Sequence, residues 1–147
     1  MREERTALAI TRDRAQEMLG ELALARLFAF SVRELATGLC VMEAPFDELF
    51  LRPGDLVSGP IYMALADAAV WVALMTIIGP VRMAVTSEMT TNFLHGAVRR
   101  GVICTARIIA VHDGLAEATA SCVDDEGTLL THHTATYSLP PTQRRER

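Results

Sequence analysis

One carboxylate stands inside an otherwise uncharged apolar segment, and it is the first candidate for chemistry in this chain. The segment from Pro60 to about Ile78 has the length and composition of a helix, and Asp67 is its only charged residue. An unpaired buried carboxylate costs several kcal/mol, so a carboxylate in this position calls for an explanation. Either it serves as a general base or nucleophile, or a neighbouring loop or strand satisfies it with hydrogen bonds.

The turn that opens this segment offers a second candidate group. It reads Ser58-Gly59-Pro60, and Pro60 suits the first helical position because its missing N–H would be unsatisfied there. The Gly59 N–H lies at the positive end of the helix dipole, where it can polarise an electron-rich oxygen. Gly59 and Asp67 are some 10 Å or more apart at about 1.5 Å per residue, so a single helix cannot bring both to one substrate atom.

Composition limits the classes of function that remain. The chain has 147 residues and 50% hydrophobic content, which predicts one domain over 1–147 with flexible ends at 1–11 and 142–147. A net charge of −4 argues against a general nucleic-acid binder. All 14 basic residues are Arg, and the absence of Lys excludes Walker-A and Schiff-base chemistry. Three cysteines without a CxxC pair predict a reduced, cytoplasmic protein.

The apolar segment raises the question of a membrane span, and the four histidines raise that of a metal site; the sequence disfavours both. Residues 61–81 could span a bilayer by length, but Asp67 would be expensive in lipid, and a helix that is apolar all round also suits a sheet wrapped around it. We therefore predict no membrane insertion. His132 and His133 are neighbours in a predicted strand and point to opposite faces, while His95 and His112 lack ligand-spaced partners. No metal site is predicted.

The remaining pattern predicts how these groups are positioned. We expect a helix over 12–26, strands over 28–34, 38–45, 81–94, 102–112, 115–123 and 129–139, and a loop over 47–55. The Asp113-Gly114 pair indicates a type I′ hairpin, and Gly79-Pro80 is expected to end the central helix. Residues alternate in the strand over 81–94, with Val85, Met89 and Phe93 on one face and Thr86, Glu88, Thr90 and Asn92 on the other. This alternation predicts a half-buried strand. The fold class is α+β: a short N-terminal helix and a long central helix wrapped by a curved antiparallel sheet.

The order of these pieces resembles the PaaI-like branch of the hotdog-fold acyl-CoA thioesterases over about two thirds of the chain. The matching pieces are Ser58-Gly59-Pro60, Ala64-Leu65-Ala66-Asp67, Val85-Thr86 through Phe93-Leu94, and Ala135 to Pro140. Many relatives read His-Gly-Gly where this chain has Ser58-Gly59-Pro60, so an orienting His and one N–H donor are absent here. The Gly59 N–H is retained.

This resemblance implies a hotdog fold that hydrolyses an acyl- or aryl-CoA thioester. Gly59 of one subunit would polarise the carbonyl, and Asp67 of the partner subunit would attack it or activate water, so a homodimer or tetramer is expected. Thr86 matches a residue that bonds the water or the carboxylate in related enzymes, although it could equally be a polar residue on a strand face. No cofactor is implied, because coenzyme A is part of the substrate.

Several further residues are candidates for substrate binding. Arg52 falls where some relatives carry an amide near the carbonyl, and it either neutralises a substrate anion or is a solvated loop residue. Arg99 and Arg100 could hold coenzyme A phosphates or be solvated surface charge. The remaining candidates flank the turn or lie near the Asp67 face of the helix: Ser58, Pro60, Met63 and Trp71. Two other functions stay open, an acyl-thioester dehydratase or hydratase on the same fold and a non-catalytic acyl-CoA-binding protein.

Overall fold

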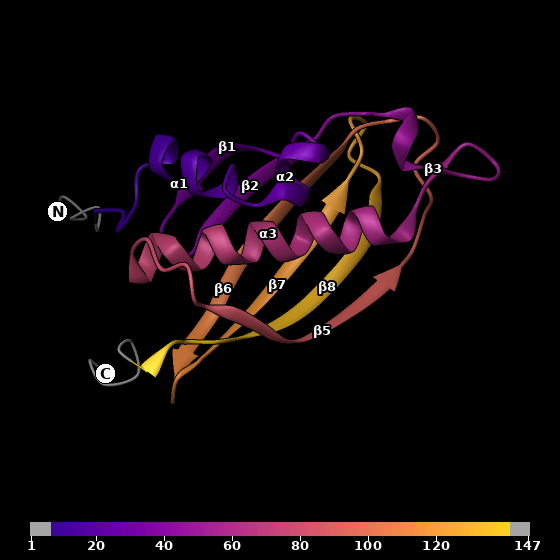
Figure 1. Cartoon of the computed structure of the whole chain (residues 1–147). Helices are drawn as coiled ribbons and strands as arrows, with labels where there is room; N and C mark the ends of the chain where they lie inside the picture. The colour runs from indigo at the N-terminus through magenta and orange to yellow at the C-terminus, as the bar shows by residue number, and fades with distance from the viewer. Residues whose placement is uncertain (1–6, 142–147) are drawn as a thin grey trace, which may run out of the picture.

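A 20-residue helix, α3 (Gly59–Ile78), runs across one face of an antiparallel sheet in the computed structural model, which describes residues 7–141 (Figure 1). The helix begins at Gly59, one residue before the predicted first position, with Ser58 as the N-cap residue. It ends as predicted: Gly79 has a φ of 87°, and its N–H donates to the Met75 carbonyl at 3.0 Å. Such a positive φ favours glycine, so the sequence sets this end of the helix.

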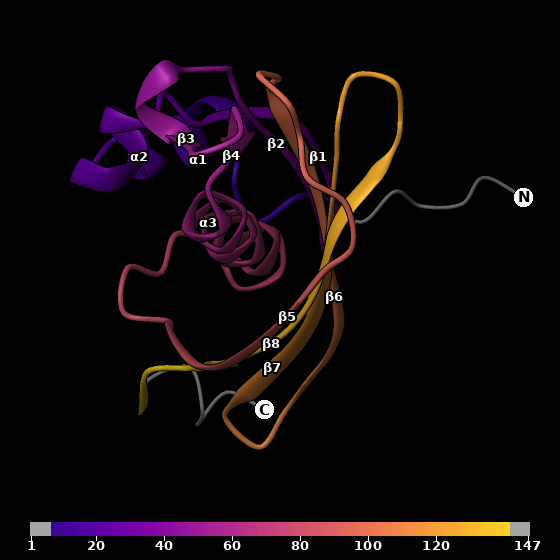
Figure 2. The ribbon, with the colours of Figure 1, turned by 90° about the vertical axis from the view of Figure 1, so that its right-hand side faces the viewer.

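The sheet has six strands and wraps around α3 (Figure 2). In chain order they are β1 (Ser31–Ala36), β2 (Leu39–Ala44), β5 (Val85–Phe93), β6 (Val102–His112), β7 (Leu115–Val123) and β8 (Leu129–Ser138). Their spatial order is β1-β2-β6-β7-β8-β5, with every neighbouring pair antiparallel. The predicted α+β fold is confirmed, and β5 forms one edge of the sheet.

The apolar character of α3 reflects burial inside the fold. It is the one described helix that is long and apolar enough to span a membrane, with a mean hydropathy of 2.0, and 72% of its most apolar window is buried. Leu65, Val72, Leu74 and Met75 are completely enclosed. The interpretation of α3 as a core helix, against which the sheet packs, is therefore confirmed.

The N-terminal segment differs from the single predicted helix over 12–26. It forms two helices, α1 (Arg12–Leu19) and α2 (Ala23–Leu27), because α1 ends with Gly20 as its C-cap. Leu22, the N-cap residue of α2, is 42% exposed. The first strand starts at Ser31 rather than 28, since Ala29 adopts a φ of 54° in the preceding turn.

Part of the end over 1–11, for which we predict flexibility, contacts the rest of the fold. The Ala9 N–H donates to the Thr76 carbonyl at 3.0 Å, and Ile10 is buried, so this part of the end is anchored. Residues 1–6 and 142–147 lie outside the described residues. The predicted loop over 47–55 is also more ordered than expected: it contains a 3-10 turn, η1 (Glu48–Phe50), and the hairpin of β3 (Leu51–Arg52) with β4 (Leu56–Val57).

Strand β5 contains an irregularity that corrects the predicted assignment of its faces. Thr86 pairs with Tyr137 of β8 and Glu88 with Thr136, so the register shifts between Thr86 and Glu88. The extra residue of this bulge reverses the alternation. Thr86 therefore shares the α3 side with Met89, and not the outer side with Glu88. The strand also starts at Val85 instead of 81, and it is mostly exposed, not half-buried as predicted.

Candidate functional site

The Asp67 carboxylate is held by two hydroxyl groups from the sheet. Thr86 Oγ1 and Tyr137 Oη both donate to Asp67 Oδ1, each at 2.5 Å. The Tyr137 hydroxyl also lies 2.7 Å from the Asp67 backbone carbonyl, so its single proton can serve either oxygen. No described residue bonds Asp67 Oδ2. One carboxylate oxygen is thus fixed and the other is available to accept a proton or attack an electrophile.

These two donors reach Asp67 because of the bulge in β5 and the register of β8. The bulge turns Thr86 to the α3 side, and Tyr137 lies opposite Thr86 in the adjacent strand. Burial and the nearby Asp67 carboxylate raise the pKa of the Tyr137 phenol, so it remains a proton donor. The sequence pattern alone assigned no role to Tyr137. The available signal was that the last strand carries a tyrosine on its inner face. The hydroxyl of a buried tyrosine needs a hydrogen-bond partner.

Asp67 opens into a cavity of about 370 Å³ that is otherwise largely apolar. One wall comes from α2 and the residues on either side of it, with Leu22, Leu24 and Phe30, and the other comes from α3, with Ala68 and Trp71. The Trp71 indole N–H is satisfied by the Val81 carbonyl at 3.0 Å, so its ring is fixed in place. Trp71 and Asp67 thus line the same cavity.

One cation lies in this cavity, but its charge is already matched. Arg82 makes two hydrogen bonds to the Glu21 carboxylate, at 2.8 and 2.7 Å. This pair lowers the pKa of Glu21 and raises that of Arg82 through the hydrogen bond between them, so both stay charged. It also joins the α1–α2 turn to the segment before β5. Among the described residues, the cavity thus presents an apolar wall and a carboxylate, without an unpaired positive charge.

Gly59 lies in a second cavity, also of about 370 Å³, at the other end of β5. The C-terminal end of β5 lies beside the start of α3 (Figure 1), and a Cβ on Gly59 would be 3.2 Å from the Phe93 ring. Since the φ of Gly59 is not positive, glycine is needed there for space and not for a special dihedral angle. No described residue accepts the Gly59 N–H, so it can bind an oxygen in the cavity.

The other candidates from the turn and the helix are more dispersed. Ser58 makes no side-chain cap hydrogen bond, although its N–H donates to the Phe50 carbonyl at 2.7 Å. Pro60 and Met63 are exposed, Met63 by 39%, and they line neither of the two cavities. Within one chain the structure brings Asp67, Thr86 and Trp71 together, and it keeps Gly59 apart from them.

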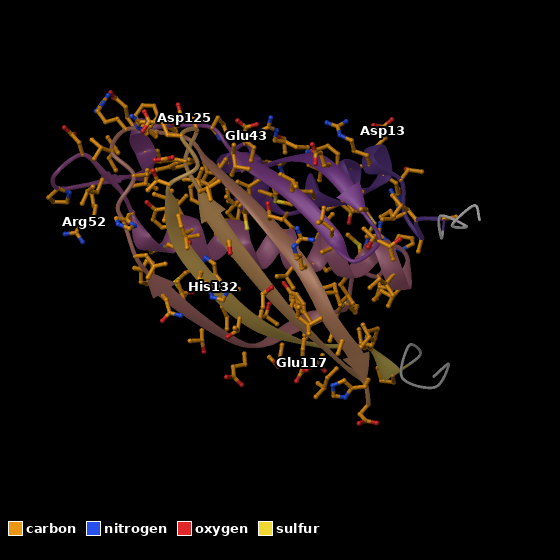
Figure 3. All side chains as sticks on the ribbon, turned by 180° about the vertical axis from the view of Figure 1, so that it is seen from behind. Asp13, Glu43, Arg52, Glu117, Asp125 and His132 are labelled. Carbon is orange, nitrogen blue, oxygen red and sulfur yellow. The ribbon has the colours of Figure 1, made fainter. Side chains whose placement is uncertain are left out.

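The three arginine candidates differ in their partners. Arg52 lines the Gly59 cavity, is exposed at one end of the molecule (Figure 3), and has no ion pair with a described residue. Arg99 pairs with Glu48 at 2.8 Å and with Asp55 at 3.6 Å, while Arg100 pairs with Asp125 at 2.6 Å. A substrate anion would have to compete with these carboxylates at Arg99 and Arg100, but not at Arg52.

The histidines separate into buried and exposed positions. His133 is buried between Thr91 and Thr131, whose hydroxyl oxygens lie 2.8 and 2.7 Å from its ring nitrogens. His132 lies on the outer face of the sheet (Figure 3), so the two neighbouring histidines point to opposite faces, as predicted. His95 lines the Gly59 cavity, a position that its spacing in the sequence did not reveal.

Known proteins match this chain over most of its length. A family model described as "Thioesterase superfamily" matches residues 54–131, more than half of the chain. A protein of Thermoplasma acidophilum whose name proposes an esterase is 27% identical over 114 residues, which is 78% of this chain and 86% of that protein.

Two solved structures extend the likeness to nearly the whole fold. One, from Silicibacter sp. TM1040, bears a name that proposes a thioesterase; it is 28% identical, with a TM-score of 0.82 over 94% of this chain and 97% of that one. The other is the PaaI protein of the phenylacetic acid degradation operon of E. coli, with 17% identity and a TM-score of 0.79 over 87% of this chain and 91% of that one.

Proposed function

Since the chain belongs to the thioesterase superfamily and has its hotdog fold, we propose that it hydrolyses acyl-CoA thioesters at a site shared by two subunits. Asp67 of one subunit acts on a carbonyl that is polarised by the Gly59 N–H of the other. Fold alone would not select this activity. The proposal rests on the positions of these two groups at opposite ends of β5.

The observation that carries the proposal is the geometry of the exposed edge strand. Asp67 is bonded to Thr86 at the start of β5, and Gly59 lies against Phe93 at its end. Within the described residues β5 pairs with β8 on one side only, and Val85 and Phe93 are 50% and 57% exposed. An open edge of this length is a template for another strand. Antiparallel pairing of two β5 strands about a two-fold axis sets the start of one beside the end of the other. Gly59 then faces Asp67 of the partner subunit.

The chemistry follows from what each group can do. Asp67 Oδ2 takes a proton from water while the resulting hydroxide adds to the thioester carbonyl, or Oδ2 adds to the carbonyl itself. In the second route the departure of the thiolate leaves an anhydride, which water then cleaves to regenerate Asp67. In both routes negative charge develops on the carbonyl oxygen, which the Gly59 N–H stabilises. The C–S bond then breaks, its electron pair goes to sulfur, and the thiolate is protonated from solvent.

The cavity beside Asp67 suggests the class of acyl group. Its walls are largely apolar, and Arg82 is paired with Glu21. A distal carboxylate on the acyl chain would therefore leave water for a site in which the described residues offer no unpaired cation. An uncharged alkyl or aryl acyl group, which can pack against Trp71 and Phe30, fits this cavity. A cytoplasmic location and a dimer or tetramer remain part of the proposal.

The test is release of coenzyme A thiol from a panel of thioesters. We expect turnover of octanoyl-, benzoyl- and phenylacetyl-CoA, and at least tenfold lower kcat/KM for succinyl- and glutaryl-CoA because their carboxylates are not matched. Binding of these thioesters without thiol release from any of them would identify a non-catalytic acyl-CoA-binding protein instead.

A dehydratase is the second candidate, and the position of His95 is the observation that favours it. His95 lines the Gly59 cavity, and the proposed pairing sets that cavity beside Asp67 of the partner subunit. A His with a carboxylate could move protons during dehydration of a 3-hydroxyacyl-CoA. Formation of enoyl-CoA from such a substrate, faster than thiol release, would favour this activity over hydrolysis.

Arg99 and Arg100 provide a separate prediction about binding of the coenzyme. If coenzyme A phosphates displace the carboxylate partners of these two arginines, replacing both by Gln should raise KM for acyl-CoA more than it lowers kcat, because contacts to distant phosphates stabilise ground and transition states alike. The effect should shrink as salt is added. Steady-state kinetics at two ionic strengths measure it. An unchanged KM at low salt would show that the two arginines do not bind the substrate and serve only in their ion pairs with Glu48, Asp55 and Asp125.

A further inference from the structure

The Gly59 cavity contains two polar side chains that the proposed chemistry does not use. Its walls are largely apolar, with Leu56, Phe93 and the ring of Tyr62 among them, while Arg52 and His95 are polar side chains at its surface. The Tyr62 hydroxyl oxygen accepts the Ala97 N–H at 3.1 Å, which leaves the phenol proton to donate. The cavity therefore combines a long apolar surface with one cation, one imidazole and this phenol.

The hydrogen bond of His95 determines which of its nitrogens faces a ligand. Nδ1 lies 3.0 Å from the Leu129 carbonyl oxygen. A carbonyl oxygen only accepts, so Nδ1 must carry the proton in this bond. In the neutral ring Nε2 is then an acceptor, and no described residue donates to it. His95 is exposed, so this acceptor is accessible from the cavity side of the loop.

Arg52 is the cation at this end of the molecule that remains free for an anion. It is exposed beyond the sheet (Figure 3) and has no ion pair with a described residue, whereas the nearby Arg99 is matched by Glu48 and Asp55. A guanidinium that is not neutralised by carboxylates is well suited to bind phosphate.

We propose that this cavity holds the pantetheine arm of the thioester, with His95 Nε2 accepting an amide N–H of the arm and Arg52 binding the phosphates beyond it. The inference rests on the proposed function, which sets the thioester carbonyl at Gly59. From there the acyl group enters the Asp67 cavity of the partner subunit, and the rest of the substrate has to leave through the Gly59 cavity. An amide N–H that leaves water needs an acceptor, and His95 supplies one among apolar walls.

A series of shortened substrates tests each contact separately. The same acyl group is attached to coenzyme A, to pantetheine, which lacks the phosphates, and to N-acetylcysteamine, which keeps only the amide nearest to sulfur. His95→Asn keeps an amide N–H near the Nδ1 position for Leu129 but has no counterpart of Nε2. We expect it to raise KM roughly three- to tenfold for acyl-CoA and acyl-pantetheine, with kcat changed less than twofold. His95→Gln, which places an amide near Nε2, should restore part of the affinity.

The series also locates the amide and the phosphate contact. If the His95→Asn penalty persists with the N-acetylcysteamine thioester, the nearer amide is bound; if it appears only with pantetheine, the farther amide is bound. Arg52→Gln should raise KM for acyl-CoA alone, roughly tenfold at low salt. Two matched substitutions on the outer sheet face, His132→Asn and Arg107→Gln, should leave every KM unchanged.

Two results would overturn the inference while leaving hydrolysis intact. The first is an unchanged KM in His95→Asn for acyl-CoA and acyl-pantetheine, with wild-type turnover that still depends on Asp67. The second is an Arg52→Gln penalty as large with acyl-pantetheine as with acyl-CoA. Failure of the proposed function is distinguishable, because the wild type would then release thiol from none of the thioesters. Calorimetry with free coenzyme A gives a readout that is independent of turnover, and both variants should weaken its binding.

Discussion

Asp67→Asn is expected to lower kcat by about a hundredfold or more with little change in stability. The amide keeps an oxygen that can accept from Thr86 and Tyr137, whose hydroxyls lie 2.5 Å from Oδ1. It loses the second carboxylate oxygen as a base or nucleophile. Thiol-release kinetics measure the loss, and thermal unfolding shows whether the fold is retained.

Tyr137→Phe is the matched control for this experiment. It removes one of the two hydroxyls on Oδ1 but leaves the carboxylate, so we expect a smaller loss, about tenfold. The order of the two effects is the critical result. Near-wild-type turnover in Asp67→Asn, or a larger loss in Tyr137→Phe, would make Asp67 a structural group that positions Tyr137.

The second large effect is recovery of activity from two inactive chains. Gly59→Val should lose most of kcat/KM, because a Cβ at Gly59 already lies 3.2 Å from the Phe93 ring and a larger side chain crowds the bound carbonyl. Asp67→Asn is inactive for a different reason. If each site uses Gly59 from one subunit and Asp67 from the other, a mixed dimer has one site with both defects and one site with none.

Random exchange of the two variants should therefore restore about a quarter of wild-type activity, since half of the dimers are mixed and half of their sites are intact. Each variant alone, exchanged with itself in the same way, is the control. Sedimentation must show that mixed dimers form. Mixed dimers without recovered activity, or a wild-type monomer that is fully active, would contradict a site shared between subunits.

The parts of this site that the sequence predicted are those set by local periodicity. The spacing from Gly59 to Asp67 and the end of α3 at Gly79 follow from helix geometry and from residue types whose conformations are known. Thr86 was predicted as a candidate, but on the wrong face of the strand. The extra residue of the bulge, between Thr86 and Glu88, exchanges the faces of the side chains before it. An alternating sequence pattern does not reveal such a bulge.

Contacts between distant segments could not be predicted in the same way. Tyr137 bonds Asp67, which is 70 residues away in the chain. This contact depends on how β8 pairs with β5, because the pairing sets Tyr137 opposite Thr86 on the α3 side of the sheet. The two-residue strands β3 and β4 are too short for a periodic signal, so Arg52 and His95 could not be assigned to a common cavity. Tertiary pairing, more than residue type, decides these positions.

The wall of the Asp67 cavity has a consequence for how proteins of this kind diverge. The matched family segment, 54–131, contains Gly59, Asp67 and Thr86, whereas Leu22, Leu24 and Phe30 of the wall precede it. One wall of the cavity thus lies outside the matched family segment, while the opposite wall, with Ala68 and Trp71, lies inside it. If the proposed function holds, substitutions at Leu22, Leu24 and Phe30 would change the shape of the acyl cavity and leave Gly59, Asp67 and Thr86 untouched, so acyl preference could diverge while the reacting groups are kept.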